Sequence, residues 1–356
     1  MTRLQKFQKR IEALADAALI SSPQNQRYLS EFSFEDGYLL VFADEAFLLT
    51  DGRYIEAAEK AAPEGFTVLA PREGRMETVS RLLAKRGAKT LAFEESHLSV
   101  RLKERFAEAV LPATLVGGVS KELCELRICK DEKELQNIKK AQEITDAAFS
   151  HILSVLTPTM REIDVALELE FFMRRMGSEG VAFDTIAVSG SASALPHGVP
   201  RNMPLEKGFL TMDFGARVGG YCADMTRTVA IGSADVEMKK LYQTVLRTQE
   251  AALARAAAGV SCAALDRVAR EVIDSNGYEG CFLHSLGHGV GLDIHEAPSL
   301  SRAAGEAVLQ PGMVVTVEPG IYLGGRYGCR IEDMIAVCAD GVLNFTKSSK
   351  DLIEIG

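Results

Sequence analysis

Acidic and histidine side chains that could bind a metal gather in the second half of the chain. Three of its six histidines, His284, His288 and His295, lie close together in a glycine-rich stretch. The acids that accompany them are Asp213, Asp224, Glu318 and Glu332. Four carboxylates with one imidazole form the ligand set of a paired, oxygen-rich metal site.

The four acids occupy two segments of similar design. In each segment a diglycine separates two acids: Asp213 and Asp224 around Gly219-Gly220, and Glu318 and Glu332 around Gly324-Gly325. Diglycine favours a hairpin turn, and antiparallel pairing would place the two acids of each hairpin roughly opposite one another. Buried carboxylates without counter-charge cost several kcal/mol each, so we expect two divalent cations. The alternative is four solvated acids at strand edges.

The histidines cannot all bind one ion. Glycines make a helix through His284 and His288 unfavourable. If the segment is extended, the two rings lie on one face but roughly 13 Å apart. We therefore assign His288 to the metal and His284 to the substrate. His295 and His197 lie beside glycines and acids, which favours function over packing, but their spacing alone does not place them.

The elements that must position these residues fall into two domains. Residues 1–125 alternate strand and helix patterns, which predicts an α/β domain without a phosphate-binding glycine-rich loop. Strands are expected at 37–42, 46–49, 67–70 and 91–93, and helices at 75–86 and 99–110. His97 stands alone there and is interpreted as a surface or capping histidine.

Residues 126–356 form the second predicted domain, of the α+β class. A helix begins after Asp131, with Glu134 completing a capping box. Helix pairs are expected from residue 131 to 176 and from 236 to 275, each followed by acid-bearing strands at 208–231 and 281–346. This repeat of a helix pair and a hairpin predicts two duplicated halves.

Composition excludes several classes of protein. The 356 residues suit two domains, and the net charge of −9 argues against nucleic acid or an anionic membrane as the main partner. No apolar run reaches the length of a membrane helix, and the first twenty residues predict an amphipathic helix rather than a signal peptide. The seven scattered cysteines form no CxxC pair, which indicates reduced thiols and a cytoplasmic location.

The chain resembles the pita-bread metallopeptidases, in the aminopeptidase P and prolidase branch. The motifs that carry the resemblance are Ala194-Leu-Pro-His197-Gly, Met212-Asp213-Phe-Gly215, Asp224-Met-Thr-Arg-Thr228, His284-Ser-Leu-Gly-His288, His295-Glu296, Glu318-Pro-Gly-Ile-Tyr322 and Arg330-Ile-Glu332-Asp333. Two further motifs, Asp36-Gly-Tyr-Leu-Leu and Leu49-Thr-Asp-Gly-Arg-Tyr54, are similar to the family's creatinase-type N-terminal domain. The resemblance implies a pita-bread catalytic domain and a homodimer.

The resemblance also implies the role of each residue. It assigns metal ligation to Asp213, Asp224, His288, Glu318 and Glu332. It assigns substrate and transition-state contacts to His197, His284 and His295. Spacing, rather than the resemblance, predicts that Arg330 orients Glu332, because it lies two residues before Glu332 on the same strand face; Thr226 would do the same for Asp224. Mn²⁺ is the favoured metal, with Co²⁺, Zn²⁺ and Fe²⁺ as alternatives.

The predicted reaction is removal of an N-terminal residue that precedes proline. Two ions would hold a bridging water and lower its pKa so that hydroxide attacks the scissile carbonyl. His295 and one metal would stabilise the oxyanion, and Glu318 would carry the proton to the leaving nitrogen. Rival hypotheses are an inactive pita-bread binding protein and a creatinase-like amidinohydrolase that works without metal; intact ligands oppose both.

Ser299 departs from the pattern of the resemblance. Prolidases of this branch often carry an arginine at that position, four residues after the histidine of the His295-Glu296 motif. An arginine would hold the carboxylate of a dipeptide. Its absence predicts that Xaa-Pro-Yaa peptides are better substrates than Xaa-Pro dipeptides, with a strict dipeptidase as the alternative.

Overall fold

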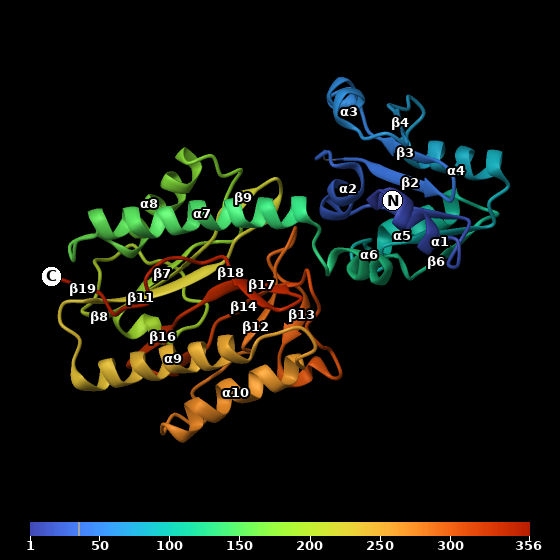
Figure 1. Cartoon of the computed structure of the whole chain (residues 1–356). Coiled ribbons are helices and arrows are strands. Elements are labelled where there is room, and N and C mark those ends of the chain that lie inside the picture. Colours follow the sequence, from blue (N-terminus) through green and yellow to red (C-terminus); the bar gives the residue numbers. More distant parts are fainter. Residues whose placement is uncertain (35) are drawn as a thin grey trace. The chain divides into compact units, whose positions relative to one another are not determined.

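The computed structural model describes residues 1–34 and 36–356. The chain divides into two compact units, Met1–Arg127 and Ile128–Gly356, and each unit has its own hydrophobic core. Figure 1 labels the elements of both units. Among the described residues, no helix is long and apolar enough to cross a membrane.

The N-terminal unit is built on a six-stranded mixed sheet of order β4-β3-β2-β1-β5-β6. Its strands are β1 (Ala17–Ile20), β2 (Tyr38–Phe42), β3 (Ala46–Leu49), β4 (Phe66–Leu69), β5 (Thr90–Phe93) and β6 (Thr114–Val116). Its helices are α1 (Arg3–Ile11), α2 (Pro23–Ser30), α3 (Ile55–Ala61), α4 (Arg75–Arg86), α5 (Val100–Ala109) and α6 (Val119–Arg127). The strands expected at 37–42, 46–49, 67–70 and 91–93 and the helices expected at 75–86 and 99–110 are therefore confirmed. His97 is exposed and its ring lies 3.2 Å from Ser21 Oγ, as expected for a surface histidine.

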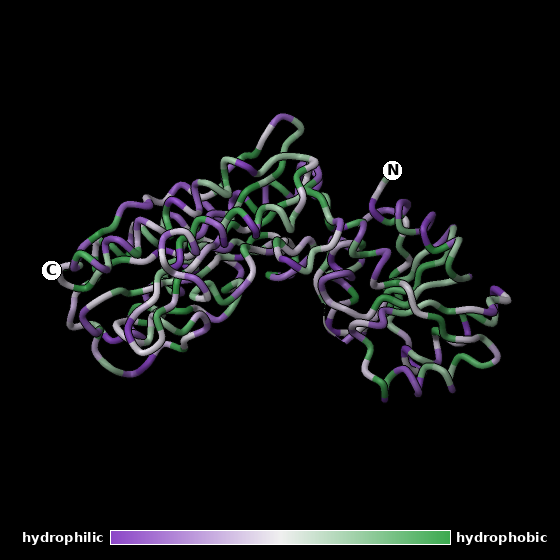
Figure 2. Tube along the Cα trace, turned by 90° about the horizontal axis from the view of Figure 1, so that it is seen from below, coloured by the Kyte–Doolittle hydropathy of each residue, from purple (hydrophilic) through white to green (hydrophobic). Residues whose placement is uncertain are grey.

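The N-terminal amphipathic helix is shorter than expected. Helix α1 ends at Ile11, and β1 follows as an inner strand between β2 and β5. All four residues of β1 are buried. A strand buried on both faces has no alternation of apolar and polar residues, so the sequence pattern does not reveal it. Figure 2 shows this sheet as a mostly hydrophobic interior.

The second unit has two halves, each opening with a helix pair. The first half contains α7 (Glu132–Val155), α8 (Glu162–Arg175), β7 (Ile186–Ser189), η1 (Gly190–Ala194), β8 (Gly208–Phe214), β9 (Arg217–Val218), β10 (Tyr221–Cys222) and β11 (Met225–Ile231). The second half contains α9 (Val236–Arg255), α10 (Cys262–Ser275), β12 (Gly287–Gly289), β13 (Glu296–Leu300), η2 (Arg302–Ala304), β14 (Val314–Val317), β15 (Gly320–Leu323), β16 (Tyr327–Arg330), β17 (Asp333–Cys338) and β18 (Gly341–Asn344). The short strand β19 (Glu354–Ile355) returns to pair with β11.

The helix pairs cover opposite sides of the strands. In Figure 1, α7 and α8 lie on one side and α9 and α10 on the other. Each pair packs on the core of its own half: α7 and α8 with β8 and β11, and α9 and α10 with β14 and β17. The strands form two main sheets, β19-β11-β8-β7 and β13-β12-β14-β17-β18. This architecture is the expected pita-bread fold with duplicated halves.

The predicted start of α7 is confirmed. The Asp131 side chain accepts a hydrogen bond from the backbone N–H of Glu134, and the Glu134 side chain accepts one from the backbone of Asp131, each at 2.9 Å. This reciprocal capping satisfies two backbone donors that the first turn of a helix otherwise leaves unpaired.

Strand register brings the acids of each hairpin to one end. In the first hairpin Asp213 pairs with Thr226, and Asp224 precedes β11 directly, so the two acids are near neighbours rather than strict partners. Gly219 and Gly220 take φ values of +60° and +82° in the turn between β9 and β10, where a side chain would be strained. In the second half, Val317 of β14 pairs with the first residue of β17. Glu318 and Glu332 therefore lie at the same end of this strand pair.

Candidate metal centre and active site

The five predicted metal ligands come from both halves of the second unit. Asp213 lies in β8, Asp224 precedes β11, His288 lies in β12, Glu318 follows β14, and Glu332 lies between β16 and β17. All five line one cavity of about 690 Å³. The other predicted site residues line the same cavity: His197, His284, His295 and Arg330. The structure thus brings every predicted site residue to one place.

The ligand set fits a divalent metal centre. Donor atoms of Asp224, His288 and Glu332 lie within 4.8 Å of one another. His288 Nε2 lies 3.2 Å from Glu318 Oε1 and 3.5 Å from Asp224 Oδ2. Within the described chain, the buried atoms Asp213 Oδ1 and Glu332 Oε1 have no hydrogen-bond partner. Buried carboxylate oxygens without a donor are costly, and coordination to a cation would satisfy them.

Electrostatic repulsion marks this cluster of acids. Burial, and then the negative charges of Glu332 and Asp213, raise the pKa of Asp224 well above its usual value. Burial and the charge of Glu318 do the same to the pKa of Glu332. Burial also opposes ionisation of Glu318, but the hydrogen bond and charge of His288 outweigh burial and hold the Glu318 pKa at about 2. Divalent cations would reverse the shifts of Asp224 and Glu332, because they favour the ionised form.

Hydrogen bonds to the ligands cross between the two halves. Thr226 of the first half donates to Glu332 Oε2 at 2.7 Å. Arg330 of the second half donates from Nη2 to Asp213 Oδ2 at 2.6 Å, and from Nε to Thr226 Oγ1 at 2.9 Å. The sequence instead predicts contacts within each hairpin, Arg330 with Glu332 and Thr226 with Asp224. That pairing is wrong because β16 lies against the first-half strands, an arrangement that spacing along one strand does not reveal.

Tyr322 fixes the proton arrangement of His284. Arg330 Nη1 donates to the Tyr322 hydroxyl at 2.7 Å, and this hydroxyl lies 2.8 Å from His284 Nε2. The carbonyl of Ser285 can only accept, so in a neutral ring His284 carries its proton on Nδ1, and Nε2 accepts from the Tyr322 hydroxyl. The other ring nitrogen, Nδ1, then donates to the carbonyl of Ser285 at 2.8 Å. Burial lowers the pKa of His284 and raises that of Tyr322 to about 12, which agrees with a neutral ring and a protonated hydroxyl.

His295 and His197 lie at the exposed part of the cavity. The ring of His295 is 4.2 Å from that of His288, centroid to centroid. Burial, followed by the charge of His288, lowers the pKa of His295. The neighbouring residue, Glu296, accepts a hydrogen bond from the buried ammonium of Lys130. His197 is exposed, and the carbonyl of the residue before it accepts from Arg330 at 3.3 Å.

Two buried acids, each paired with an arginine, hold the segments that carry His197 and His284. On α8, Glu162 accepts from the backbone N–H of Ser189 at 2.7 Å and from that of Arg201 at 2.9 Å, and it also pairs with the Arg201 side chain. These bonds close the loop that carries His197. The sequence interpretation missed Glu162 and Arg201, which lie 39 residues apart.

The second pair performs the same task on α10. Asp266, whose side chain is 0% exposed, pairs with Arg270 at 2.7 Å and accepts from the backbone of Leu286 at 3.1 Å. Arg270 also donates to the carbonyl of His284 at 2.6 Å. The sequence interpretation missed these residues too, although an acid and an arginine four apart on a helix, beside the apolar Leu265 and Ala269, were a usable signal.

Comparison with known proteins identifies the class. The model of metallopeptidase family M24 matches residues 136–339, and that of the creatinase/prolidase N-terminal domain matches residues 3–129. The chain therefore belongs to metallopeptidase family M24. It is an enzyme of the pita-bread fold, and its family implies divalent metal ions.

Individual relatives cover nearly the whole chain. The chain is 38% identical to the Xaa-Pro dipeptidase of Pyrococcus furiosus, over 99% of each protein. The structure of an Xaa-Pro dipeptidase from Bacillus anthracis matches with a TM-score of 0.95 and 39% identity, covering 99% of both chains. An X-Pro aminopeptidase from Thermotoga maritima matches with a TM-score of 0.91 and 38% identity, covering 97% of this chain and 100% of that one.

Proposed function

We propose that this protein is a dinuclear metal-dependent Xaa-Pro peptidase, which hydrolyses the bond between an N-terminal residue and proline. The observation that carries the proposal is one cavity in which four carboxylates and His288 meet three further histidines. The names of the relatives, Xaa-Pro dipeptidase and X-Pro aminopeptidase, support the substrate class. We further propose residues 1–125 as the creatinase-type domain and residues 126–356 as the catalytic domain.

Asp213, Asp224, His288, Glu318 and Glu332 would hold the metal ions. When bound, divalent cations lower the pKa of coordinated water and polarise the scissile carbonyl. Oxygen-rich ligation with one imidazole suits Mn²⁺, which we propose as the metal, with two ions per chain. Co²⁺, Zn²⁺ and Fe²⁺ are the alternatives.

Glu318 is the proposed proton shuttle. Its carboxylate accepts a hydrogen bond from Thr316 at 3.0 Å, lies 3.2 Å from His288 Nε2 and lines the cavity, where it could accept a proton from water. Glu318 would then deliver that proton to the leaving imino nitrogen of proline. This transfer is needed because an imino nitrogen leaves as a neutral amine only after protonation.

The histidines would bind the substrate and the developing negative charge. His295 is placed beside His288 and would donate to the oxyanion. Both ring nitrogens of His284 already have a partner, Tyr322 for Nε2 and Ser285 for Nδ1. His284 would therefore contact the substrate either after one of these hydrogen bonds breaks or through the Tyr322 hydroxyl. Exposed His197 would contact the peptide from the opposite loop. Arg330 orients Asp213 and Tyr322 together.

Peptide length would depend on Ser299. Ser299 of β13 pairs with His288 of β12 in the register of the sheet, so the two side chains share a face. An arginine at this position would therefore extend towards the metal ligands, whereas serine offers one neutral hydroxyl. Arg302 does not replace it, because its guanidinium lies beside Asp266 at 3.9 Å and lines a different cavity. We propose a preference for Xaa-Pro-Yaa over Xaa-Pro; a strict dipeptidase is the second candidate, favoured by the names of several relatives.

The assembly and location are also proposals. The homodimer is proposed from the family resemblance. The cytoplasmic location is proposed because the seven cysteines are all free thiols.

The test is hydrolysis of Ala-Pro, Ala-Pro-Ala and Ala-Ala-Ala by metal-free protein and by protein loaded with Mn²⁺. The proposal predicts cleavage of the proline peptides only after loading, with Ala-Pro-Ala the better substrate. Equal cleavage of Ala-Ala-Ala would contradict the Xaa-Pro specificity. A clear preference for Ala-Pro would favour the dipeptidase.

A further inference from the structure

Two buried charges beside the metal ligands have no part in the proposed reaction. Arg227 follows Thr226 in β11, and Asp333 follows Glu332 at the start of β17. Each side chain is only 1% exposed, and the two pair at 2.9 Å. Both belong to the sequence motifs that supply the metal ligands, yet neither side chain lines the cavity. Burying such a pair is costly unless its hydrogen bonds are complete, so its position needs an explanation.

Arg227 uses all five of its N–H groups. Nη1 donates to the carbonyl of Thr226 at 3.0 Å and to the carbonyl of Glu332. Nη2 donates to Asp333 Oδ1 and to the carbonyl of Ser348, each at 2.9 Å, and Nε donates to the carbonyl of Ser349 at 3.0 Å. The guanidinium therefore ties the backbone of β11, in the first half, to the backbone of a metal ligand in the second half.

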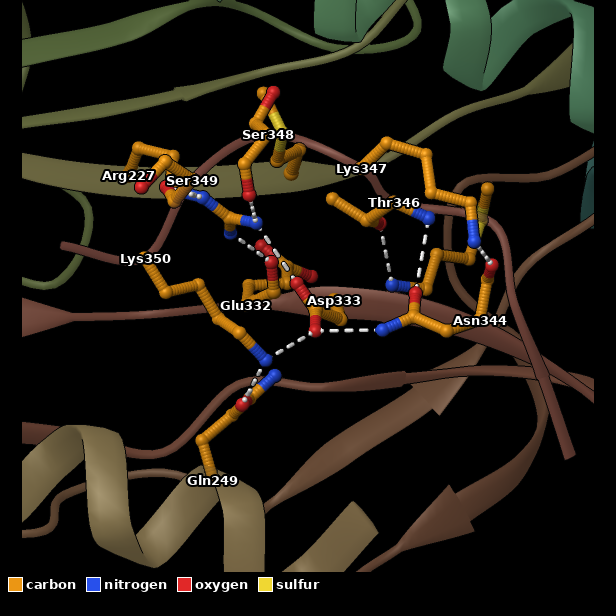
Figure 3. Close-up of polar contacts among 12 residues, drawn as sticks. Arg227, Gln249, Glu332, Asp333, Asn344, Thr346, Lys347, Ser348, Ser349 and Lys350 are labelled. Atoms are coloured by element: carbon orange, nitrogen blue, oxygen red, sulfur yellow. Dashed lines mark hydrogen bonds and ion pairs between the residues drawn. The ribbon is translucent and has the colours of Figure 1, made fainter.

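The Asp333 carboxylate accepts two further hydrogen bonds. Its second oxygen, Oδ2, accepts from Asn344 Nδ2 and from Lys350 Nζ, each at 2.8 Å. The ammonium of Lys350 also donates to Gln249 of α9 at 2.8 Å. Figure 3 shows these contacts as one network around Asp333, next to Glu332. Its two cations and one anion leave a net positive charge there, which opposes the mutual repulsion of the four acids.

We infer that Arg227 and Asp333 are positioning residues that set the spacing between the ligands of the two halves, so that the site takes up metal without rearranging. The inference rests on the proposed metal centre. Metal affinity depends on such supports because ligands that are already placed lose less conformational freedom on binding, and loss of an outer hydrogen-bond partner typically weakens affinity about 10- to 100-fold. Lys350 acts indirectly, by keeping the Asp333 carboxylate in place.

The experiment measures Mn²⁺ binding to metal-free protein by calorimetry, in the parent, Arg227→Lys, Asp333→Asn and Lys350→Met. Asp333→Asn keeps the shape of the side chain and removes its charge, and Lys350→Met is the mildest change because Lys350 is partly exposed. Lys239→Met is the matched control, since it breaks the pair of Lys239 with Glu354, another contact of the C-terminal segment, which lies at the end of β11 away from Asp224.

We expect Mn²⁺ affinity to fall at least about tenfold in Asp333→Asn and Arg227→Lys, and less in Lys350→Met, with no change in Lys239→Met. The Mn²⁺ concentration for half-maximal activity should rise in parallel, while kcat at saturating Mn²⁺ stays near that of the parent. If Arg227→Lys does not fold, the other two variants carry the test.

A purely structural role has a different signature. Variants that unfold at lower temperature but bind Mn²⁺ as tightly as the parent would overturn the positioning role and leave the peptidase proposal intact. A parent that binds no Mn²⁺, or that cleaves no Xaa-Pro peptide, would instead overturn the proposed function and this inference with it.

Discussion

The two halves of the catalytic unit share a plan but contribute different chemistry. Each half has a helix pair, an acid-bearing hairpin and, on its second helix, a buried acid that pairs with an arginine. Of the proposed metal ligands, the first half supplies the two aspartates, and the second supplies the two glutamates and His288. The hydrogen bonds that orient these acids cross between the two halves, since Thr226 donates to Glu332 and Arg330 donates to Asp213. Repetition of the fold thus supplies the proposed ligands, and contacts between the repeats position them.

The largest loss of metal and activity is expected when one proposed ligand is removed from either half. Asp213→Ala and Glu332→Ala should each lose metal and activity together, because each deletes a negative ligand from a centre shared by both halves. The loss of affinity should exceed the roughly 100-fold expected for an outer hydrogen-bond partner. Metal content after gel filtration, with Lys239→Met as the control, checks this. If Asp213→Ala keeps full metal content, Asp213 is not a ligand of the centre.

Changing one glutamate without removing its oxygen should separate chemistry from binding. Glu318→Gln keeps an oxygen for coordination but cannot carry a proton. We expect turnover to fall at least roughly 100-fold, the scale of general acid–base catalysis. Single-turnover rates at saturating Mn²⁺ measure it. Near-native turnover at full metal occupancy would remove Glu318 from the proton path.

The acid–arginine pairs of the two halves should act on different histidines. Asp266→Asn should displace His284, and Glu162→Gln should displace His197, each lowering kcat/KM by about 10- to 100-fold. Metal content should not change, because neither pair touches a ligand. The check is to combine Asp266→Asn with His284→Ala, and Glu162→Gln with His197→Ala. In each double variant the acid substitution should cause little further loss of kcat/KM, because the histidine that it displaces is already absent. Simple additivity in both backgrounds would mean that the pairs only stabilise the fold.

Local patterns predicted much of this arrangement, but contacts between distant segments escaped them. The cap of α7 was predictable because Asp131 and Glu134 are neighbours on one turn. The acids were found because diglycine turns mark the hairpins. The partners of Thr226 and Arg330 were not predictable, since they depend on which strands of the two halves lie together. Strand β1 was missed because its burial on both faces removes alternation.

A smaller effect is expected from Ser299, in the second half. Ser299→Arg should raise kcat/KM for Ala-Pro roughly tenfold, because a charge-assisted bond to the carboxylate contributes on the order of 1.5–3 kcal/mol. Ala-Pro-Ala, whose carboxylate lies further out, should change little. The ratio of the two kcat/KM values is the readout. A parent that already prefers Ala-Pro, with no gain from the substitution, would show that another group binds the carboxylate.

The most direct test of the shared metal centre is a stepwise titration of metal-free protein with Mn²⁺ while Ala-Pro-Ala hydrolysis is followed. If the two halves hold two ions between them, activity should be absent without metal and should reach its maximum at two Mn²⁺ per chain. Full activity in protein shown to contain no metal would contradict the account. Saturation at one Mn²⁺ per chain would contradict the dinuclear centre.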